Sequence, residues 1–196
     1  MTMKHEITRT DIMPMDEYGK LRAAKRREMR PIKDRRRVAL GPDATFYFES
    51  YETMWHQVHE MLYIERGGEE QIADELHAYN PLIPKGSELV ATVMFEIDNP
   101  DRRAKVLGKL GGVEEMMVLE VGGDAITAVA EEDVDRTSAA GKASSVQFVH
   151  FPFGPAQKAA FKTPGARVLL SITHPAYQHA AVIPEEVRAE LAKDLD

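Results

Sequence analysis

The sequence predicts an α+β fold, with a mainly antiparallel sheet of about 5–7 strands and helices packed on it. Strand-forming runs come in adjacent pairs around short turns, as they do in hairpins. Runs with helical spacing are concentrated in the N-terminal half of the chain. A length of 196 residues suits one compact domain. We therefore expect a single domain over residues 1–196, with a basic helical segment at about 14–37 and an α+β body at about 38–196.

The first expected helix covers residues 15–37 and follows Pro14. Its apolar residues recur at helical spacing. Pro31 should kink or end this helix, because proline has no N–H for the helical hydrogen bond. Two short β-rich runs follow at 35–41 and 44–50, on either side of a Gly-Pro-Asp turn. Their arrangement predicts a β-hairpin.

Two more helices and a long strand complete the N-terminal half. The first of these helices should cover 51–65, because Gly67 and Gly68 stop it. The second should cover 69–80, with its apolar residues on one face. Residues 88–98 are rich in β-branched side chains and are bounded by turn residues, which predicts a strand.

Glycine and proline mark the elements of the C-terminal half. A Gly-Gly-Asp turn at 122–124 predicts a hairpin, and Pro184 suits the first turn of a final helix. In order, the expected elements are a short helix at 100–112, a hairpin at 114–133, a polar loop at 133–143, a strand at 144–153, a short helix or turn at 154–165, strands at 166–174 and 175–184, and a helix at 184–195. The adjacency of most strand pairs favours antiparallel pairing.

Composition excludes several classes of site. The chain has no cysteine, so disulfides, thiolate nucleophiles and cysteine-ligated metal clusters are excluded. No apolar run approaches the length of a membrane span, and residues 1–15 lack the apolar core of a signal peptide. We therefore expect a cytoplasmic protein without a membrane partner, while the sequence leaves homo-oligomerisation open.

Charge is distributed unevenly along the chain. Residues 1–40 contain twelve Lys or Arg and six Asp or Glu, a net charge of +6, whereas the remainder has a net charge of −13. A basic element on an acidic body favours pairing with a charged partner, and an acidic protein is the partner that we expect. The side chains predicted to bind it are Arg22, Lys25, Arg26, Arg27 and Arg30.

Nucleic-acid binding is an alternative role for the basic segment at 22–37, which has nine Lys or Arg residues in sixteen positions. The segment contains no aromatic side chain on which a base could stack. The pI of about 5.5 also counts against a nucleic-acid binder. We therefore rank weak binding of nucleic acid or a nucleotide below binding of an acidic protein.

The stretch FESYETMWHQVHEMLYIER at 48–66 contains two histidines and four glutamates. Helical geometry places four of these six side chains on one side: Glu52, His56, His59 and Glu60. Imidazole and carboxylate ligands together suit Fe, Mn or Zn, and His174 and His179 could complete such a site. A metal-binding protein or metal-dependent enzyme is thus another alternative, although the spacing matches no zinc-peptidase motif. The competing interpretation is an ordinary amphipathic helix with its His/Glu side in water.

Four stretches carry a resemblance to a known family. They are ITRTDIMPMDEY, KDRRRVALGPDATFYFESYETMWHQVHEML, ELHAYNPLIPKGSELVATVMFEI and SITHPAYQHAAVIPEEVRAELAKDL. Together they resemble the bacterial domain-of-unknown-function family 3501 over nearly the whole chain. Genes of that family are typically neighbours of rubrerythrin, a di-iron peroxide-reducing protein, and of an iron–sulfur oxidoreductase. The resemblance implies an accessory or partner protein in a rubrerythrin-linked redox or oxidative-stress pathway.

The resemblance also changes the weight of individual residues. The family pattern has YQIQEM where this chain has WHQVHEM, so His56 and His59 depart from it. The polar residues that match the family are Arg36, Arg37, Glu49, Glu65 and Arg66, together with Glu52 and Glu60. Because buried charges must be paired, we expect arginines and glutamates of this set to form a network. The family implies no particular reaction.

Overall fold

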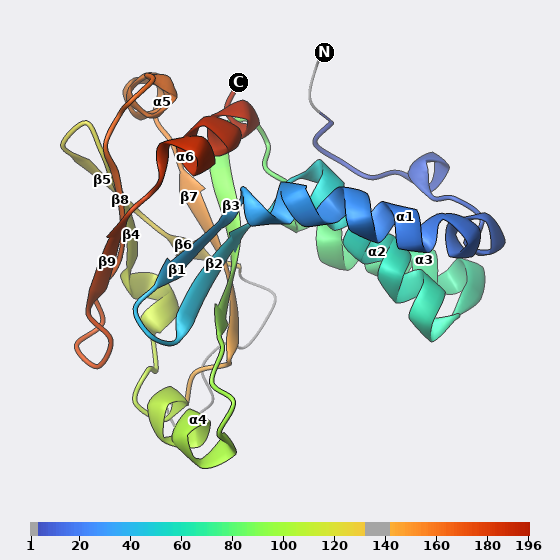
Figure 1. The fold of residues 1–196 in the computed structure, drawn as a ribbon, viewed down its shortest axis with the longest axis horizontal. Helices are drawn as coiled ribbons and strands as arrows, with labels where there is room; N and C mark the ends of the chain where they lie inside the picture. Colours follow the sequence, from blue (N-terminus) through green and yellow to red (C-terminus); the bar gives the residue numbers. More distant parts are fainter. Residues whose placement is uncertain (1–3, 132–141) are drawn as a thin grey trace.

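The computed structural model describes residues 4–131 and 142–196 and confirms the α+β fold (Figure 1). The elements of the first half are, in order, η1 (Arg9–Asp11), α1 (Met15–Asp34), β1 (Arg37–Leu40), β2 (Ala44–Phe48), α2 (Tyr51–Glu65), α3 (Gly68–Tyr79), η2 (Asn80–Leu82) and β3 (Glu88–Phe95). They are followed by α4 (Pro100–Leu107), η3 (Val113–Met116), β4 (Met117–Val121), β5 (Asp124–Thr127), β6 (Val129–Ala130), β7 (Val146–Pro152), α5 (Pro155–Lys162), β8 (Val168–Ile172), β9 (His179–Val182), α6 (Glu185–Leu191) and η4 (Ala192–Asp194). The predicted polar loop at 133–143 lies almost entirely outside the described residues.

The strands form two sheets, and the strands that the sequence predicts are distributed over both. The five-stranded sheet has the order β1-β2-β3-β7-β6, and the four-stranded sheet has the order β5-β4-β8-β9. All strand pairs within these two sheets are antiparallel. The predicted β1–β2 and β4–β5 hairpins are confirmed. In the second hairpin, Gly122 and Gly123 have φ values of 62° and 89°, a conformation that favours glycine.

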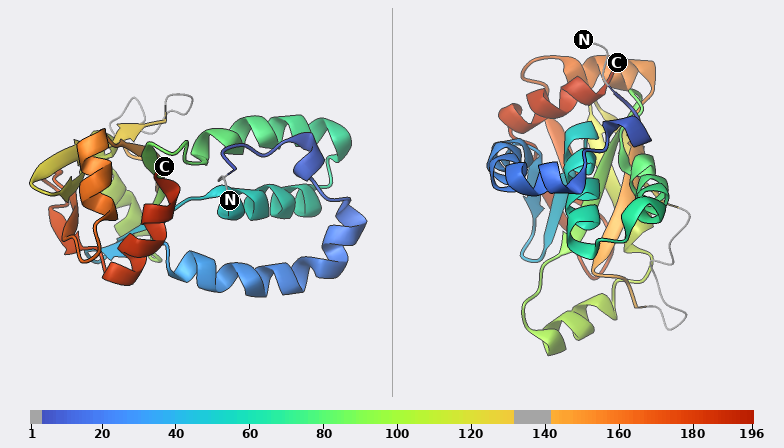
Figure 2. Two further views of the ribbon diagram at one scale, coloured as in Figure 1. Left: turned by 90° about the horizontal axis from the view of Figure 1, so that it is seen from above. Right: turned by 90° about the vertical axis from the view of Figure 1, so that its right-hand side faces the viewer.

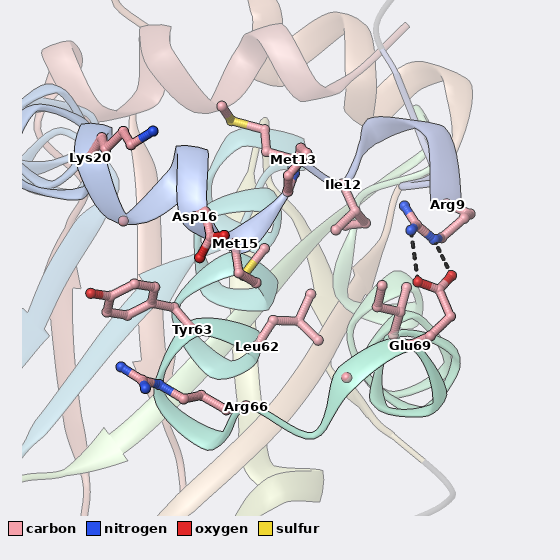
Figure 3. A pocket seen from close by; sticks show the side chains of 14 residues that line it. Arg9, Ile12, Met13, Met15, Asp16, Lys20, Leu62, Tyr63, Arg66 and Glu69 are labelled. Atoms are coloured by element: carbon pink, nitrogen blue, oxygen red, sulfur yellow. Dashed lines mark hydrogen bonds and ion pairs between the residues drawn. The ribbon is translucent and has the colours of Figure 1, made fainter.

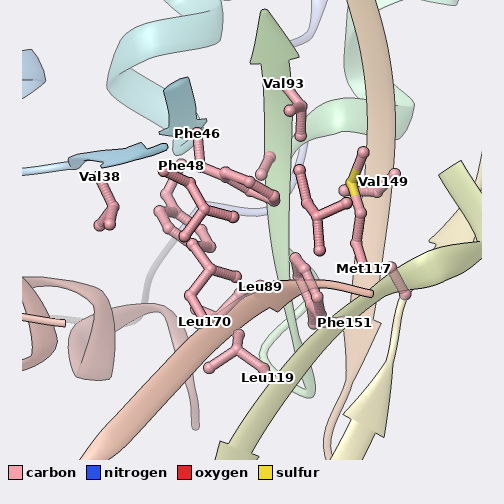
Figure 4. Packing of buried hydrophobic residues seen from close by; sticks show 14 of the residues in the cluster. Val38, Phe46, Phe48, Leu89, Val93, Met117, Leu119, Val149, Phe151 and Leu170 are labelled. Carbon is pink, nitrogen blue, oxygen red and sulfur yellow. The ribbon is translucent and has the colours of Figure 1, made fainter. Parts of the chain in front are cut away.

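The main hydrophobic core lies between the two sheets (Figure 4). Alternate residues of each strand face inwards, as the strand period of two requires. In β3 these inward residues are Leu89, Ala91 and Val93, which are fully buried. The rings of Phe46 and Phe151, from two other strands of the same sheet, have centroids 6.5 Å apart in this core. Helices α5 and α6 add apolar residues to the core at one end of the sheets (Figure 1).

The helices α1, α2 and α3, with η1 and η2, extend away from the five-stranded sheet and are called the helical arm below (Figure 1). Figure 2 shows α2 in the middle of the arm, with α1 on one side and α3 on the other. A second hydrophobic cluster holds the arm together and includes Ile12, Val58, Leu62 and Ile72. Val90, on the outer side of β3, belongs to the same cluster. The arm is therefore anchored on the outer face of the sheet.

Helix α1 continues to Asp34, about one turn beyond Pro31. The sequence predicted a kink or an end at this proline. Pro31 removes a single hydrogen-bond donor, and the N–H of Arg35 still donates to the Pro31 carbonyl oxygen at 3.4 Å. Neither α1 nor any other helix in the described part of the chain is long and apolar enough to cross a membrane.

A histidine bridges two carboxylates on the outer face of the five-stranded sheet. The Nδ1 atom of His150 in β7 lies 3.0 Å from Glu88 Oε2 in β3, and its Nε2 atom lies 2.7 Å from Glu131 Oε2. Burial alone would lower the pKa of His150, but the hydrogen bonds and negative charges of both glutamates outweigh burial and raise the pKa. The protonated imidazole can donate to both carboxylates at once.

This bridge predicts a pH dependence of stability. Because the folded pKa of His150 is raised above its ordinary value of 6.5, the stabilisation is fully present below pH 6.5 and is lost as the pH rises through the folded pKa. The variant His150→Gln should lack this dependence, whereas His77→Gln, at an exposed histidine of α3, should keep it. Urea unfolding between about pH 6 and about pH 9 measures the difference. A wild-type advantage over His150→Gln that stays constant across this range would contradict the prediction.

Candidate functional site

The surroundings of α2 differ from those of the predicted amphipathic helix. Ser50 caps the N-terminus of the helix, because its Oγ accepts a hydrogen bond from the Thr53 N–H at 3.3 Å. The face carrying His56 and His59, however, is not in water. These two side chains are only 7% and 0% exposed, because α1 covers that side of α2 (Figure 2). The prediction of a solvated His/Glu side was wrong for both histidines.

His59 uses both ring nitrogens for hydrogen bonds to the backbone. Its Nδ1–H donates to the Trp55 carbonyl oxygen at 2.7 Å, and its Nε2 accepts from the Met13 N–H at 3.0 Å. Burial lowers the pKa of His59, which favours the neutral imidazole that these two bonds require. The residue therefore ties the chain before α1 to α2, and neither nitrogen is available to a metal ion.

Glu60 is the centre of the polar contacts between α1 and α2. Arg22 donates to its two carboxylate oxygens at 2.8 and 2.9 Å, and the Tyr18 hydroxyl donates to one of them at 2.8 Å. These bonds, with Arg22 as the largest contributor, lower the pKa of Glu60 to about 2. The Nδ1 atom of His56 lies 3.4 Å from the Tyr18 oxygen, and burial lowers the pKa of this histidine. Glu60 thus joins the two helices as an anion at neutral pH.

The other side chains predicted to bind a metal do not join His56 and His59 in one site. Glu52 is exposed on the first turn of α2. His174 follows β8, where its Nδ1 accepts from the Ala176 N–H at 3.1 Å, and His179 in β9 packs against the Tyr177 ring. Figure 1 shows β8 and β9 on the opposite side of the molecule from α2. Within residues 4–131 and 142–196, no group of three or more His, Asp or Glu side chains is placed to hold a metal ion such as Fe, Mn or Zn.

The arginines and glutamates that we expected to form one network are also separated in the structure. Arg36 is buried, but it pairs with Asp194 and donates to the backbone oxygen of Glu49 at 2.9 Å. The carboxylate of Glu49 bonds instead to threonine hydroxyls. The remaining members are exposed: Arg37, Glu65 and Arg66. The five residues therefore do not form one network.

The cations predicted to bind a partner fall into two groups. Arg22 turns inwards to Glu60, and Lys25 pairs with Glu28 of the same helix at 3.0 Å. The other three are exposed on α1 and form no ion pair with any residue that the structure describes: Arg26, Arg27 and Arg30. Residues three and four positions apart are neighbours on a helix surface, so these three arginines form one patch. We call it the basic face.

A cleft of about 660 Å³ lies at the far end of the arm, where the start of α1 meets the end of α2 and the start of α3 (Figure 3). Its lining includes five apolar side chains: Ile12, Met13, Met15, Leu62 and Ile72. On one side of the cleft Arg9 pairs with Glu69, and Lys20 and Arg66 lie away from this pair (Figure 3). Flexible methionines and a charged rim suit a ligand whose apolar part is flanked by polar groups. We call this feature the tip cleft.

Sequence reasoning missed the tip cleft, because three segments of the chain must come together to form it. The one local signal is a backbone conformation. Arg66 ends α2 in the left-handed conformation with φ of 56°, and it is the only non-glycine residue with positive φ in the described chain. Such a conformation is uncommon for a residue with a side chain and is a reason to search for a site. The dihedral angle is visible only in the structure.

Comparison with known proteins identifies the family. The family model described as "Protein of unknown function (DUF3501)" matches residues 6–195. The chain belongs to this family. A DUF3501-like fold is also seen in the crystal structure of a novel protein of unknown function from Burkholderia pseudomallei K96243, which is 38% identical, with a TM-score of 0.90 over 97% of this chain and 99% of that chain. No curated protein matches this DUF3501 member.

Proposed function

We propose that this DUF3501 protein is an accessory protein that binds an acidic protein partner through the basic face of α1. One observation carries the proposal: the three arginines of the basic face are exposed and have no ion pair in the described chain. The rest of the chain is acidic, so the molecule is dipolar. A partner with an acidic surface would be steered to this side and would neutralise charges that the protein itself leaves unpaired.

The position of the basic face supports this role. It lies on α1, which Figure 2 shows along one side of the helical arm, so a partner can approach it without displacing the sheets. The tip cleft lies at the start of the same helix. An apolar side chain of the partner in this cleft would add the desolvated contact that charge pairing alone does not supply.

The family resemblance names the first partner to test. Because genes of this family are typically neighbours of rubrerythrin, we propose that the acidic partner is rubrerythrin and that the protein acts in a rubrerythrin-linked oxidative-stress pathway in the cytoplasm. The basic face can bind an acidic partner other than rubrerythrin, and the binding experiment with rubrerythrin distinguishes these two outcomes.

Charge reversal on the basic face should weaken binding of rubrerythrin from the source organism. We expect the variant Arg26→Glu/Arg27→Glu/Arg30→Glu to raise the Kd by about tenfold or more, because three attractive contacts become repulsive. Biolayer interferometry with immobilised rubrerythrin would measure this at about 50 mM and at about 500 mM salt. Binding by the wild type should weaken at the higher salt concentration, because screening shortens the range of charge interactions.

A matched control reverses three exposed cations on the body of the protein. The variant Lys105→Glu/Lys109→Glu/Arg167→Glu has the same change in net charge and should bind like the wild type. Equal losses in both variants would show that net charge, and not the basic face, controls binding. Absence of rubrerythrin binding at both salt concentrations would exclude rubrerythrin as the partner. Binding of a DNA duplex that depends on the basic face would favour the nucleic-acid alternative.

A further inference from the structure

A separate cavity lies where the helical arm meets the outer face of the five-stranded sheet. Its volume is about 320 Å³, at the lower end of the range of small-molecule sites. Residues of α1, α2, α3 and η2 line one side, and residues of β2, β3 and β7 line the other. We call it the junction pocket. Boundaries between packed units of a protein are frequent ligand sites.

A buried carboxylate lies in the lining of the junction pocket. Glu49 is only 8% exposed. Its Oε1 accepts a hydrogen bond from the Thr92 hydroxyl at 2.7 Å, and its Oε2 accepts one from the Thr53 hydroxyl at 2.6 Å. Both partners are neutral. The carboxylate is thus held in place from the sheet on one side and from α2 on the other.

No cation of the described chain pairs with this carboxylate. The nearby guanidinium of Arg36 donates to the backbone oxygen of Glu49 and pairs with Asp194. Lys33 lines the pocket but forms no hydrogen bond with Glu49 within the described residues. A carboxylate has room for about four hydrogen bonds, and a buried charge is costly unless it is paired. Glu49 can therefore accept further bonds from a donor inside the cavity.

The remaining walls of the junction pocket are largely apolar. Met54 and Leu82 are buried on the side of the arm, and Phe148 and Met94 line the side of the sheet. An aromatic ring and two flexible methionines can adapt to a flat or irregular apolar group. The pocket thus combines a carboxylate that is held in place with walls that favour an apolar part of a ligand.

We propose that the junction pocket binds a small primary amine with an apolar or aromatic body. The ammonium group would donate to Glu49 with charge-assisted hydrogen bonds, and the body would pack between Met54, Leu82 and Phe148. Repulsion from the carboxylate should make an anionic ligand of the same shape bind more weakly. This inference is independent of partner binding by the basic face, because none of the three arginines of that face lines the pocket.

Three matched probes test this proposal: benzylamine, benzyl alcohol and benzoate. Each is titrated into protein with ¹³C-labelled methionine methyl groups, and the signals of Met54 and Met94 are followed by NMR. We expect benzylamine to shift both signals and to bind at least about tenfold more tightly than benzoate, with benzyl alcohol between them. The variant Glu49→Gln should bind benzylamine at least about tenfold more weakly, whereas the exposed Glu65→Gln should bind it like the wild type.

A second variant keeps the test decisive if Glu49→Gln does not fold. Met94→Trp places a larger side chain at the edge of the pocket, where Met94 is 36% exposed, and should reduce benzylamine binding without altering the carboxylate. Circular dichroism would confirm that each variant is folded. The proposal is overturned if benzylamine shifts neither methionine signal, if benzoate binds as tightly as benzylamine, or if both pocket variants retain wild-type binding.

Discussion

Replacement of Arg36 by alanine should lower the free energy of unfolding by about 3–5 kcal/mol. Arg36 and Asp194 are 3% and 4% exposed and form an ion pair that joins the residue just before β1 to the C-terminal η4. The guanidinium also donates to the backbone oxygens of Phe48 and Glu49 at 3.0 and 2.9 Å. Removal of the arginine leaves a buried carboxylate and two buried carbonyl groups with fewer partners, and each is costly.

Urea unfolding would measure this loss. The double variant Arg36→Met/Asp194→Leu removes both charges and should recover most of the stability, because the penalty comes from the partner left behind. The neighbouring Arg37→Ala is the control. Arg37 is exposed and lies over the Tyr47 ring at 5.8 Å, so its replacement should cost less than about 1 kcal/mol. Equal costs for the two single variants would contradict the role given to the buried pair.

The pH dependence of the same variant identifies the group left unpaired. Burial raises the pKa of Asp194 to about 6, although Arg36 acts to lower it. Without Arg36 the pKa of this carboxyl should rise further. A raised folded pKa means that stability falls as the pH rises through it and returns below it, where Asp194 is protonated. The cost of Arg36→Ala should therefore be smaller at about pH 5 than at about pH 8. The same cost at both pH values would show that another group is responsible.

Local patterns predicted the individual elements better than they predicted the assembly. The β1–β2 and β4–β5 hairpins were predicted because each is encoded by two short runs and the turn between them. The division into two sheets was not predicted. It depends on pairs such as Ala91 of β3 with Val149 of β7, between which the chain forms β4 and β5 of the second sheet. No periodicity within one strand specifies a partner so distant in the sequence.

The candidate site shows the same limit. Helical periodicity correctly placed His56 and His59 close together on α2, but it could not show which segment would cover them. Tyr18 and Arg22 on α1 are the complementary side chains, four residues apart and both directed at Glu60. Their spacing is also typical of an ordinary helix face. The exposed cations of the basic face were predicted from charge density alone, and their partner remains a prediction.

Replacement of Tyr18 by alanine should also cost about 3–5 kcal/mol, because a large buried aromatic side chain is lost. Tyr18 is fully buried in the contact between α1 and α2. Its ring centroid lies 5.0 Å from that of His59 and 6.0 Å from that of Tyr63, and its hydroxyl donates to Glu60. Tyr18→Phe keeps the ring and leaves Glu60 bonded to Arg22, so this control should lose only about 1 kcal/mol.

The only tryptophan of the chain reports on this contact. Trp55 Nε1–H donates to the Asp11 carbonyl oxygen at 2.9 Å, and its ring packs on His59. Fluorescence therefore follows the arm, whereas far-UV circular dichroism follows the whole chain. If residues 1–196 form one cooperative domain, both unfolding transitions should move together in Tyr18→Ala. A fluorescence transition that moves alone would show that the arm unfolds as a unit of its own.

If the arm unfolds in this way, Tyr18→Ala should also weaken partner binding although the arginines of the basic face are intact, because the helix that carries them is no longer held in place. A loss below about 1 kcal/mol in Tyr18→Ala would instead show that this contact does not anchor α1.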